Sequence, residues 1–190
     1  MRKLLARAWL RLTGWAPEGE RPAAARFVLI AAPHTSNWDL VYLLALAETY
    51  ELRVSWMGKH TLFRPPFGAL FRALGGISIR REERADRVAA MAKEFAAREH
   101  FALVVPSEAT RSWAPSWKSG FYHIARRAEV PIVLGFLDYR RRRGGFGPAL
   151  VASGDVKRDM DVIRAFYADK TAKYPEHFGP VRLREEAPGE

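Results

Sequence analysis

His34 and Asp39 are the residues whose types and spacing best suit acid–base chemistry. They stand in the segment 33–39, Pro-His-Thr-Ser-Asn-Trp-Asp, which joins an apolar run to a helical pattern. A carboxylate that accepts one imidazole N–H fixes the tautomer and leaves the other ring nitrogen free as a base. It also stabilises the imidazolium that forms when the base takes a proton, as in a serine-protease triad. The pair is therefore a candidate general base for a hydroxyl, which can be the substrate's own.

The His-x4-Asp spacing is a weak signal by itself. An aspartate that only caps a helix, beside a histidine whose nitrogens are satisfied in a loop, gives the same pattern. The functional interpretation therefore depends on the other polar clusters of the chain.

A second polar cluster, Ser107 to Ser112, also follows an apolar run, and Lys118 comes shortly after it. Arg111 offers a planar fork suited to a phosphate or a carboxylate, and Lys118 adds a point charge. Glu108 either orients the arginine or accepts a bond from a substrate hydroxyl. A surface ion pair in a polar loop is the alternative, and such a pair would contribute little.

Arg80 and Arg81 follow a third apolar run, residues 77–79. Two arginines at a strand end can contact a phosphate, because the guanidinium fork matches its oxygens. The solvated end of a strand explains them equally well. Both interpretations stay open at this point.

The elements that must position these clusters alternate between strand and helix. Apolar runs predict strands at 27–31, 53–57, 77–79, 101–105 and 131–137. Helical spacing of apolar residues predicts helices from about residue 37, over 67–74, 85–98 and 120–128, and over 160–173. This alternation predicts an α/β fold: a single domain with a largely parallel mixed sheet flanked by helices. Such sheets bind ligands in the loops beyond their strand ends, where the polar clusters stand.

The N-terminal residues 1–15 form a separate pattern. Apolar residues recur at helical spacing and basic residues occupy another face: Leu5, Trp9 and Leu12 against Lys3, Arg7 and Arg11. The pattern predicts an amphipathic helix, which either lies in a membrane interface or packs on the domain core. A polar linker is expected at 17–22, the main domain over 23–183 and a frayed tail over 184–190.

Composition excludes several classes of protein and site. The chain has 190 residues and is 48% hydrophobic, which is enough to form a core. Without cysteine it has no disulfide, thiolate metal site or cysteine nucleophile. We expect no metal site, because no His, Asp and Glu cluster has a familiar ligand spacing. No Gly-x-Ser-x-Gly elbow of a serine hydrolase occurs either.

The formal net charge of +10 favours an anionic partner: nucleic acid, an anionic membrane or a phosphorylated substrate. The run of arginines at 140–143 is most simply a solvated turn between two strands, expected at 140–147. Contact with a membrane or an acidic carrier protein is the alternative. No nucleic-acid-binding motif accompanies the run, so we expect no nucleic-acid partner.

Neither a membrane span nor a signal peptide is expected. No apolar stretch approaches the ~20 residues that cross a bilayer. Arg7 and Arg11 interrupt the first apolar run, and no small-residue cleavage site follows it cleanly. We therefore expect an unprocessed cytoplasmic protein.

Four short blocks, in chain order, resemble the motif blocks of the glycerolipid acyltransferase family, the 1-acylglycerol-3-phosphate acyltransferase-like proteins. They are the His34–Asp39 motif, Gly76-Ile77 with Arg80, the segment Glu108-Ala109-Thr110-Arg111, and Val130-Pro131-Ile132-Val133. The resemblance spans about Phe27 to Leu137, which is most of the chain.

This resemblance implies an O-acyltransferase in which His34 is the general base and Asp39 orients it. Arg80, Glu108 and Arg111 would shape the pocket for the acceptor's polar head, commonly a phosphate, and Thr110 and Lys118 complete the candidate substrate-binding residues. The implied acceptor is a lysophospholipid or related lipid. Acyl-CoA or acyl carrier protein is the implied donor, as a co-substrate with no other cofactor. A lipid acceptor also implies an anionic membrane as partner, with the protein peripheral on its inner face.

The third block departs from the family pattern, which is usually Pro-Glu-Gly-Thr-Arg. Here Ser107 precedes Glu108, and Ala109 takes the glycine position. Alanine disfavours positive φ and cannot match the close backbone approach of glycine, so head-group recognition is expected to differ. The departure motivates an alternative: a catalytically inactive lipid- or acyl-binding protein of the same fold. The intact pair of His34 and Asp39 argues against that alternative.

Overall fold

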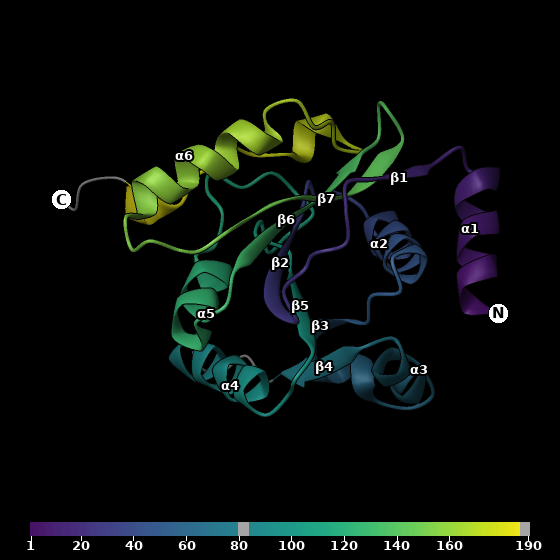
Figure 1. Ribbon diagram of the computed structural model, residues 1–190, viewed down its shortest axis with the longest axis horizontal. Helices are drawn as coiled ribbons and strands as arrows, with labels where there is room; N and C mark the ends of the chain where they lie inside the picture. Colours follow the sequence, from purple (N-terminus) through teal and green to yellow (C-terminus); the bar gives the residue numbers. More distant parts are fainter. Residues whose placement is uncertain (80–83, 187–190) are drawn as a thin grey trace.

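The chain folds around one seven-stranded sheet with helices on both faces (Figure 1). The computed structural model describes residues 1–79 and 84–186. The strands, in their order across the sheet, are β1 (Ala16–Glu18), β7 (Arg143–Leu150), β6 (Ile132–Asp138), β2 (Arg26–Ala32), β5 (Phe101–Val105), β3 (Val54–Lys59) and β4 (Gly76–Ile79). Neighbouring strands are parallel except β6 and β7, which are antiparallel. The structure thus confirms the predicted single α/β domain with a largely parallel mixed sheet.

Helices cover the sheet on both sides. They are α1 (Arg2–Leu12), α2 (Trp38–Thr49), α3 (Gly68–Ala73), α4 (Arg84–Ala96), α5 (Gly120–Ala128) and α6 (Val156–Tyr167), with short 3-10 helices η1 (His60–Phe63), η2 (Pro175–His177) and η3 (Arg184–Glu186). In Figure 1, α4, α5 and α6 lie on one side of the sheet, and α1 and α2 lie on the other. No helix within residues 1–79 and 84–186 is long and apolar enough to cross a bilayer.

The central strand β2 is buried on both faces, which explains its continuous apolar sequence. Val28 and Ile30 belong to a core that is completed by α4, α5 and α6. Phe27 and Leu29 belong to the opposite core, which α2 helps to form. Because successive side chains alternate between the two cores, the register of β2 is strongly specified.

The loops that carry the His34 and Glu108 clusters meet at the carboxyl ends of the central strands. Strand β2 pairs in parallel with β5 on one side and with β6 on the other, so the carboxyl ends of the three strands lie together. Residues 33–37, which join β2 to α2, therefore lie beside the loop after β5 and the residues after β6. Ligand sites form at such strand ends in open α/β sheets.

The helix predicted over 160–173 is displaced towards the N-terminus, since α6 spans Val156–Tyr167. Its start is fixed by Asp155, whose carboxylate accepts the N–H of Arg158 at 3.1 Å. A side-chain cap of this kind satisfies a donor that has no partner in the first helical turn. Apolar spacing did not reveal this cap, so the predicted start was wrong by four residues.

Both ends of the predicted main domain also differ in the structure. Residues 16–18 form β1, which pairs with β7, so the sheet begins within the segment expected to be a linker. The tail expected to fray from Arg184 instead forms η3 over its first three residues. There Glu186 accepts the N–H of Leu183 and pairs with Arg164. These contacts outweigh the fraying that its polar composition favours.

The arginine run forms the turn between β6 and β7. The turn is shorter than predicted, because β7 already begins at Arg143. Arg141 pairs with Glu18 at 2.8 Å, and Nη1 of Arg142 donates to the carbonyl of Thr13 at 3.4 Å. Two arginines of the run therefore hold the segment that leads from α1 into β1.

Candidate active site

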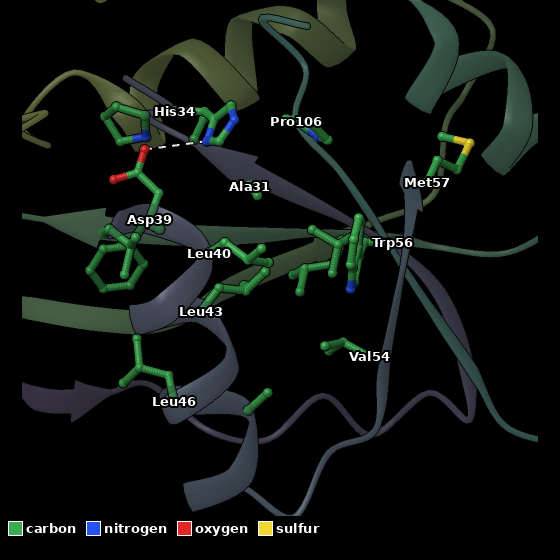
Figure 2. A pocket seen from close by; sticks show the side chains of 18 of the residues that line it. Ala31, His34, Asp39, Leu40, Leu43, Leu46, Val54, Trp56, Met57 and Pro106 are labelled. Atoms are coloured by element: carbon green, nitrogen blue, oxygen red, sulfur yellow. Dashed lines mark ion pairs between the residues drawn. The ribbon is translucent and has the colours of Figure 1, made fainter. Parts of the chain in front are cut away.

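His34 and Asp39 form a direct pair at the edge of the sheet, with His34 Nδ1 3.2 Å from Asp39 Oδ2 (Figure 2). The same carboxylate oxygen accepts the backbone N–H groups of Thr35 at 2.9 Å and Ser36 at 2.8 Å. Asp39 is the second residue of α2, where the helix dipole favours an ionised carboxylate. These contacts fix the carboxylate, so a proton held on Nδ1 leaves Nε2 of His34 free as a base.

A third residue, Tyr139, contacts the pair and was not identified from the sequence. Its hydroxyl donates to the other carboxylate oxygen, Oδ1 of Asp39, at 2.6 Å. Burial raises the pKa of Tyr139, and the hydrogen bond and charge of Asp39 raise it further, so the phenol stays protonated and acts as a donor. Tyr139 directly follows β6, and that position at the site edge was its only sequence signal.

Glu108 supports the loop of His34 through a hydrogen bond to its backbone. Its Oε1 accepts the backbone N–H of His34 at 2.6 Å, while the residue is only 3% exposed. Burial raises the pKa of Glu108 to about 7; the His34 bond opposes this shift, and the charge of Asp39 adds to it. Glu108 is not among the described residues that line the cavity beside His34. The geometry therefore gives it a supporting position at the backbone of His34, outside the cavity.

The loop after β5 holds Ala109 in a left-handed conformation, with φ at 58°. That backbone favours glycine and costs an alanine roughly 1–2 kcal/mol. The turn is closed by the N–H of Ala109, which donates to the carbonyl of Pro106 at 3.0 Å. Beyond it, Nη1 of Arg111 donates to Oδ1 of Asn37 at 2.6 Å, linking this loop to the His34 loop. Ala109 thus adopts the backbone conformation that glycine favours, although it carries a side chain.

The candidate substrate-binding residues do not all converge. Thr110 and Arg111 line the same cavity as His34. Lys118 is exposed and is not among the described lining residues. Arg80 lies outside the described residues, so the structure does not place it.

A cavity of about 710 Å³ extends from the pair between α2 and the sheet. Figure 2 shows His34 and Asp39 at one end, and Leu40, Leu43 and Leu46 of α2 across from Val54 and Trp56 of β3. The polar residues that line the cavity are His34, Asn37, Asp39, Thr110 and Arg111. The remaining lining is mainly apolar. The site therefore joins the His34–Asp39 pair to a largely apolar space.

Comparison with protein families identifies the chain. The acyltransferase family model matches residues 17–133, which include His34, Asp39 and the loop of Arg111. The chain belongs to the acyltransferase family. In this acyltransferase, Tyr139 lies beyond the stretch that the family model matches.

The fold of this acyltransferase is similar to that of the 1-acyl-sn-glycerophosphate (LPA) acyltransferase PlsC from Thermotoga maritima, with a TM-score of 0.61. The two sequences are 15% identical, and the match covers 90% of this chain and 80% of that one. At this identity the likeness shows a shared fold alone. A search of curated protein sequences gives no match.

Proposed function

We propose that this acyltransferase moves an acyl group from a thioester donor to a hydroxyl of a lysophospholipid or related lipid. The observation that carries the proposal is the His34–Asp39 pair at one end of a largely apolar cavity of about 710 Å³. The donor is acyl-CoA or acyl carrier protein, whose acyl chain the cavity would hold. Formation of a new ester from an acyl thioester and a lysolipid tests the proposal.

The proposed reaction needs one base that later acts as an acid. Nε2 of His34 takes the proton of the acceptor hydroxyl while its oxygen attacks the thioester carbonyl. Asp39 stabilises the resulting imidazolium. The tetrahedral intermediate then collapses, the C–S bond breaks, and the thiolate leaves with the proton from His34. The products are an ester and a free thiol, and no side chain is acylated.

The proposed acceptor head lies near Arg111, which lines the cavity beside His34. Its guanidinium is bonded to Asn37 and has further N–H donors available for phosphate oxygens. A phosphate on the acceptor suits both this residue and the net charge of +10.

Blocking the cavity is expected to change the acyl preference. Leu43 lines it, and a tryptophan there would occupy space that a long chain needs. Leu43→Trp should lower kcat/KM for palmitoyl-CoA by about tenfold or more relative to hexanoyl-CoA, because steric conflict in an apolar site costs ~1–3 kcal/mol. The measurement is the ratio of the two constants with one acceptor.

Val41→Trp is the matched control, since Val41 lies on the same helix and is 41% exposed. It should leave the ratio at the wild-type value. An unchanged ratio in a folded Leu43→Trp protein would show that the cavity does not hold the acyl chain.

The proposed membrane contact is the outer face of α1. The helix packs on the domain through Ala6 and Leu10, yet Leu4, Leu5 and Leu12 are 70%, 66% and 85% exposed. Packing on the domain core therefore accounts for one face of the helix, and it leaves the exposed leucines unexplained. An exposed apolar row beside basic residues suits binding in a membrane interface, and anionic lipid of the inner face would attract the positive charge.

This face adjoins the candidate active site. Trp9 of α1 stacks on Trp38, with ring centroids 6.3 Å apart and planes 11° apart. Trp38 is 47% exposed and precedes Asp39 in the chain. A membrane contact through α1 would therefore bring lipid acceptors close to the base.

Leu4→Glu/Leu5→Glu is expected to weaken binding to anionic vesicles by about tenfold or more, because two apolar side chains leave the interface. Sedimentation with vesicles containing phosphatidylglycerol measures this. Val151→Glu/Val162→Glu makes the same charge change at side chains that are 78% and 50% exposed on another part of the surface. Equal weakening by both variants would show that charge alone, and not α1, controls binding.

A further inference from the structure

We infer that Tyr139 is a positioning residue for the base: its hydroxyl holds Oδ1 of Asp39 and so fixes the place and the charge of the carboxylate that faces His34. The inference rests on the proposed function, because it assigns Tyr139 a part in the same proton transfer. Tyr139 follows the stretch 17–133 that the family model matches, so the family comparison does not cover it.

The hydrogen bond of Tyr139 completes the set of donors around Asp39. Oδ2 receives the backbone N–H groups of Thr35 and Ser36 and faces Nδ1 of His34. Oδ1 receives the hydroxyl of Tyr139 at 2.6 Å. Asp39 is only 5% exposed, so water has little access to replace a lost donor. Tyr139 thus fixes the one carboxylate oxygen that the backbone of residues 35–36 does not hold.

Neighbouring residues fix the ring of Tyr139 independently of its bond to Asp39. Its edge meets Trp15 at a centroid distance of 4.9 Å and Tyr42 at 6.0 Å. Trp15 and Tyr42 stack on each other at 4.3 Å, and Nζ of Lys173 lies 5.7 Å from the centroid of the Tyr139 ring. The N–H of Tyr139 also donates to the carbonyl of Thr171 at 2.8 Å. These contacts therefore hold the hydroxyl in position to donate to Asp39.

The expected consequence is electrostatic as well as geometric. A donor on Oδ1 disperses the negative charge of Asp39, which leaves less of it to stabilise an imidazolium. Without the donor, more of that charge faces Nδ1 of His34. The other charged groups around the base stay in place: Glu108 behind the backbone of His34, Arg111 on Asn37, and Lys173 beside Tyr139.

Tyr139→Phe removes this donor and keeps the ring. It should lower kcat by about tenfold or more while changing KM little, because a carboxylate held on only one oxygen no longer keeps the imidazole in its reactive position, and this loss of positioning outweighs the added negative charge. The acidic limb of the pH profile of kcat/KM should move to higher pH, because more of the negative charge of Asp39 then faces the imidazole. Tyr42→Phe, which removes a hydroxyl from the same aromatic cluster, should show neither effect.

A double-mutant cycle separates action through Asp39 from a general packing defect. In an Asp39→Asn background, Tyr139→Phe should have little further effect on kcat. An independent effect there, or a wild-type pH profile in the single variant, would overturn the inference. If Tyr139→Phe unfolds at a lower temperature than wild type, the same double-mutant cycle is measured in the free energy of unfolding. Absence of coupling between Tyr139 and Asp39 in that cycle would overturn the inference equally.

The controls also separate this inference from the proposed function. If wild type turns over and His34→Ala does not, but Tyr139→Phe matches Tyr42→Phe, only the role of Tyr139 fails. If wild type shows no turnover with any acceptor, the proposed function fails. The unfolding cycle then still decides whether Tyr139 positions Asp39.

Discussion

His34→Ala is expected to lower kcat/KM by about a thousandfold or more, because a positioned general base contributes ~10²–10⁴-fold and alanine cannot take the proton. The fold should survive. The side chain of His34 is 21% exposed, and the bond between its backbone N–H and Glu108 does not depend on the imidazole. Initial rates and a melting curve on the same preparation measure both expectations.

His100→Ala is the matched control for that variant, since His100 is exposed and lies before β5, away from the pair. It should retain the wild-type rate and melting temperature. A His34→Ala protein that keeps more than about a tenth of the wild-type kcat/KM would contradict the role of His34 as general base.

Glu108→Gln is expected to change the pH dependence of stability. Burial raises the pKa of Glu108 from 4.5 to about 7, so the folded state resists ionisation of this carboxyl. Its contribution to stability is fully present below pH 4.5 and is lost as the pH rises to about 7. A shift of this size corresponds to ~3 kcal/mol, which wild type should lose and the glutamine variant should not.

Glutamine suits this test because its amide oxygen can still accept the N–H of His34 without carrying charge. The measurement is the free energy of unfolding by urea at pH 4.5 and at pH 8 for both proteins. Relative to wild type, Glu108→Gln should gain ~3 kcal/mol between the two values. The exposed Glu99→Gln serves as control and should gain little. Equal differences at both pH values for Glu108→Gln would show that the buried carboxyl does not ionise in this range.

The sequence was informative where the signal is local. Strand β2 carries an unbroken apolar run because both of its faces are buried, and α2 follows a short polar loop. The His34–Asp39 spacing lies within that loop and the first helical turn, so its geometry could be predicted once strand and helix were recognised. Glu108 was predicted to bind substrate, and the structure places its carboxylate on the backbone N–H of His34, outside the lining of the cavity.

Long-range features were not available from such patterns. Tyr139 is 100 residues from Asp39 along the chain, and only the pairing of β6 with β2 brings it to the same edge. Strand β1 has three residues, too few for a visible period, and its pairing with β7 alone defines it. The cavity depends on how α2 is spaced from the sheet, which no local pattern records.

The most direct test of the proposed function is to incubate wild type with palmitoyl-CoA and a 1-acylglycerol-3-phosphate, and to follow free CoA and the new diacyl product together. We predict equal amounts of CoA and product, both dependent on the acceptor and both absent with His34→Ala. The same assay with an acylated carrier protein distinguishes the two donors. Thioester binding without product from either donor, across phosphorylated and unphosphorylated lysolipids, would contradict acyl transfer and favour an inactive acyl-binding protein.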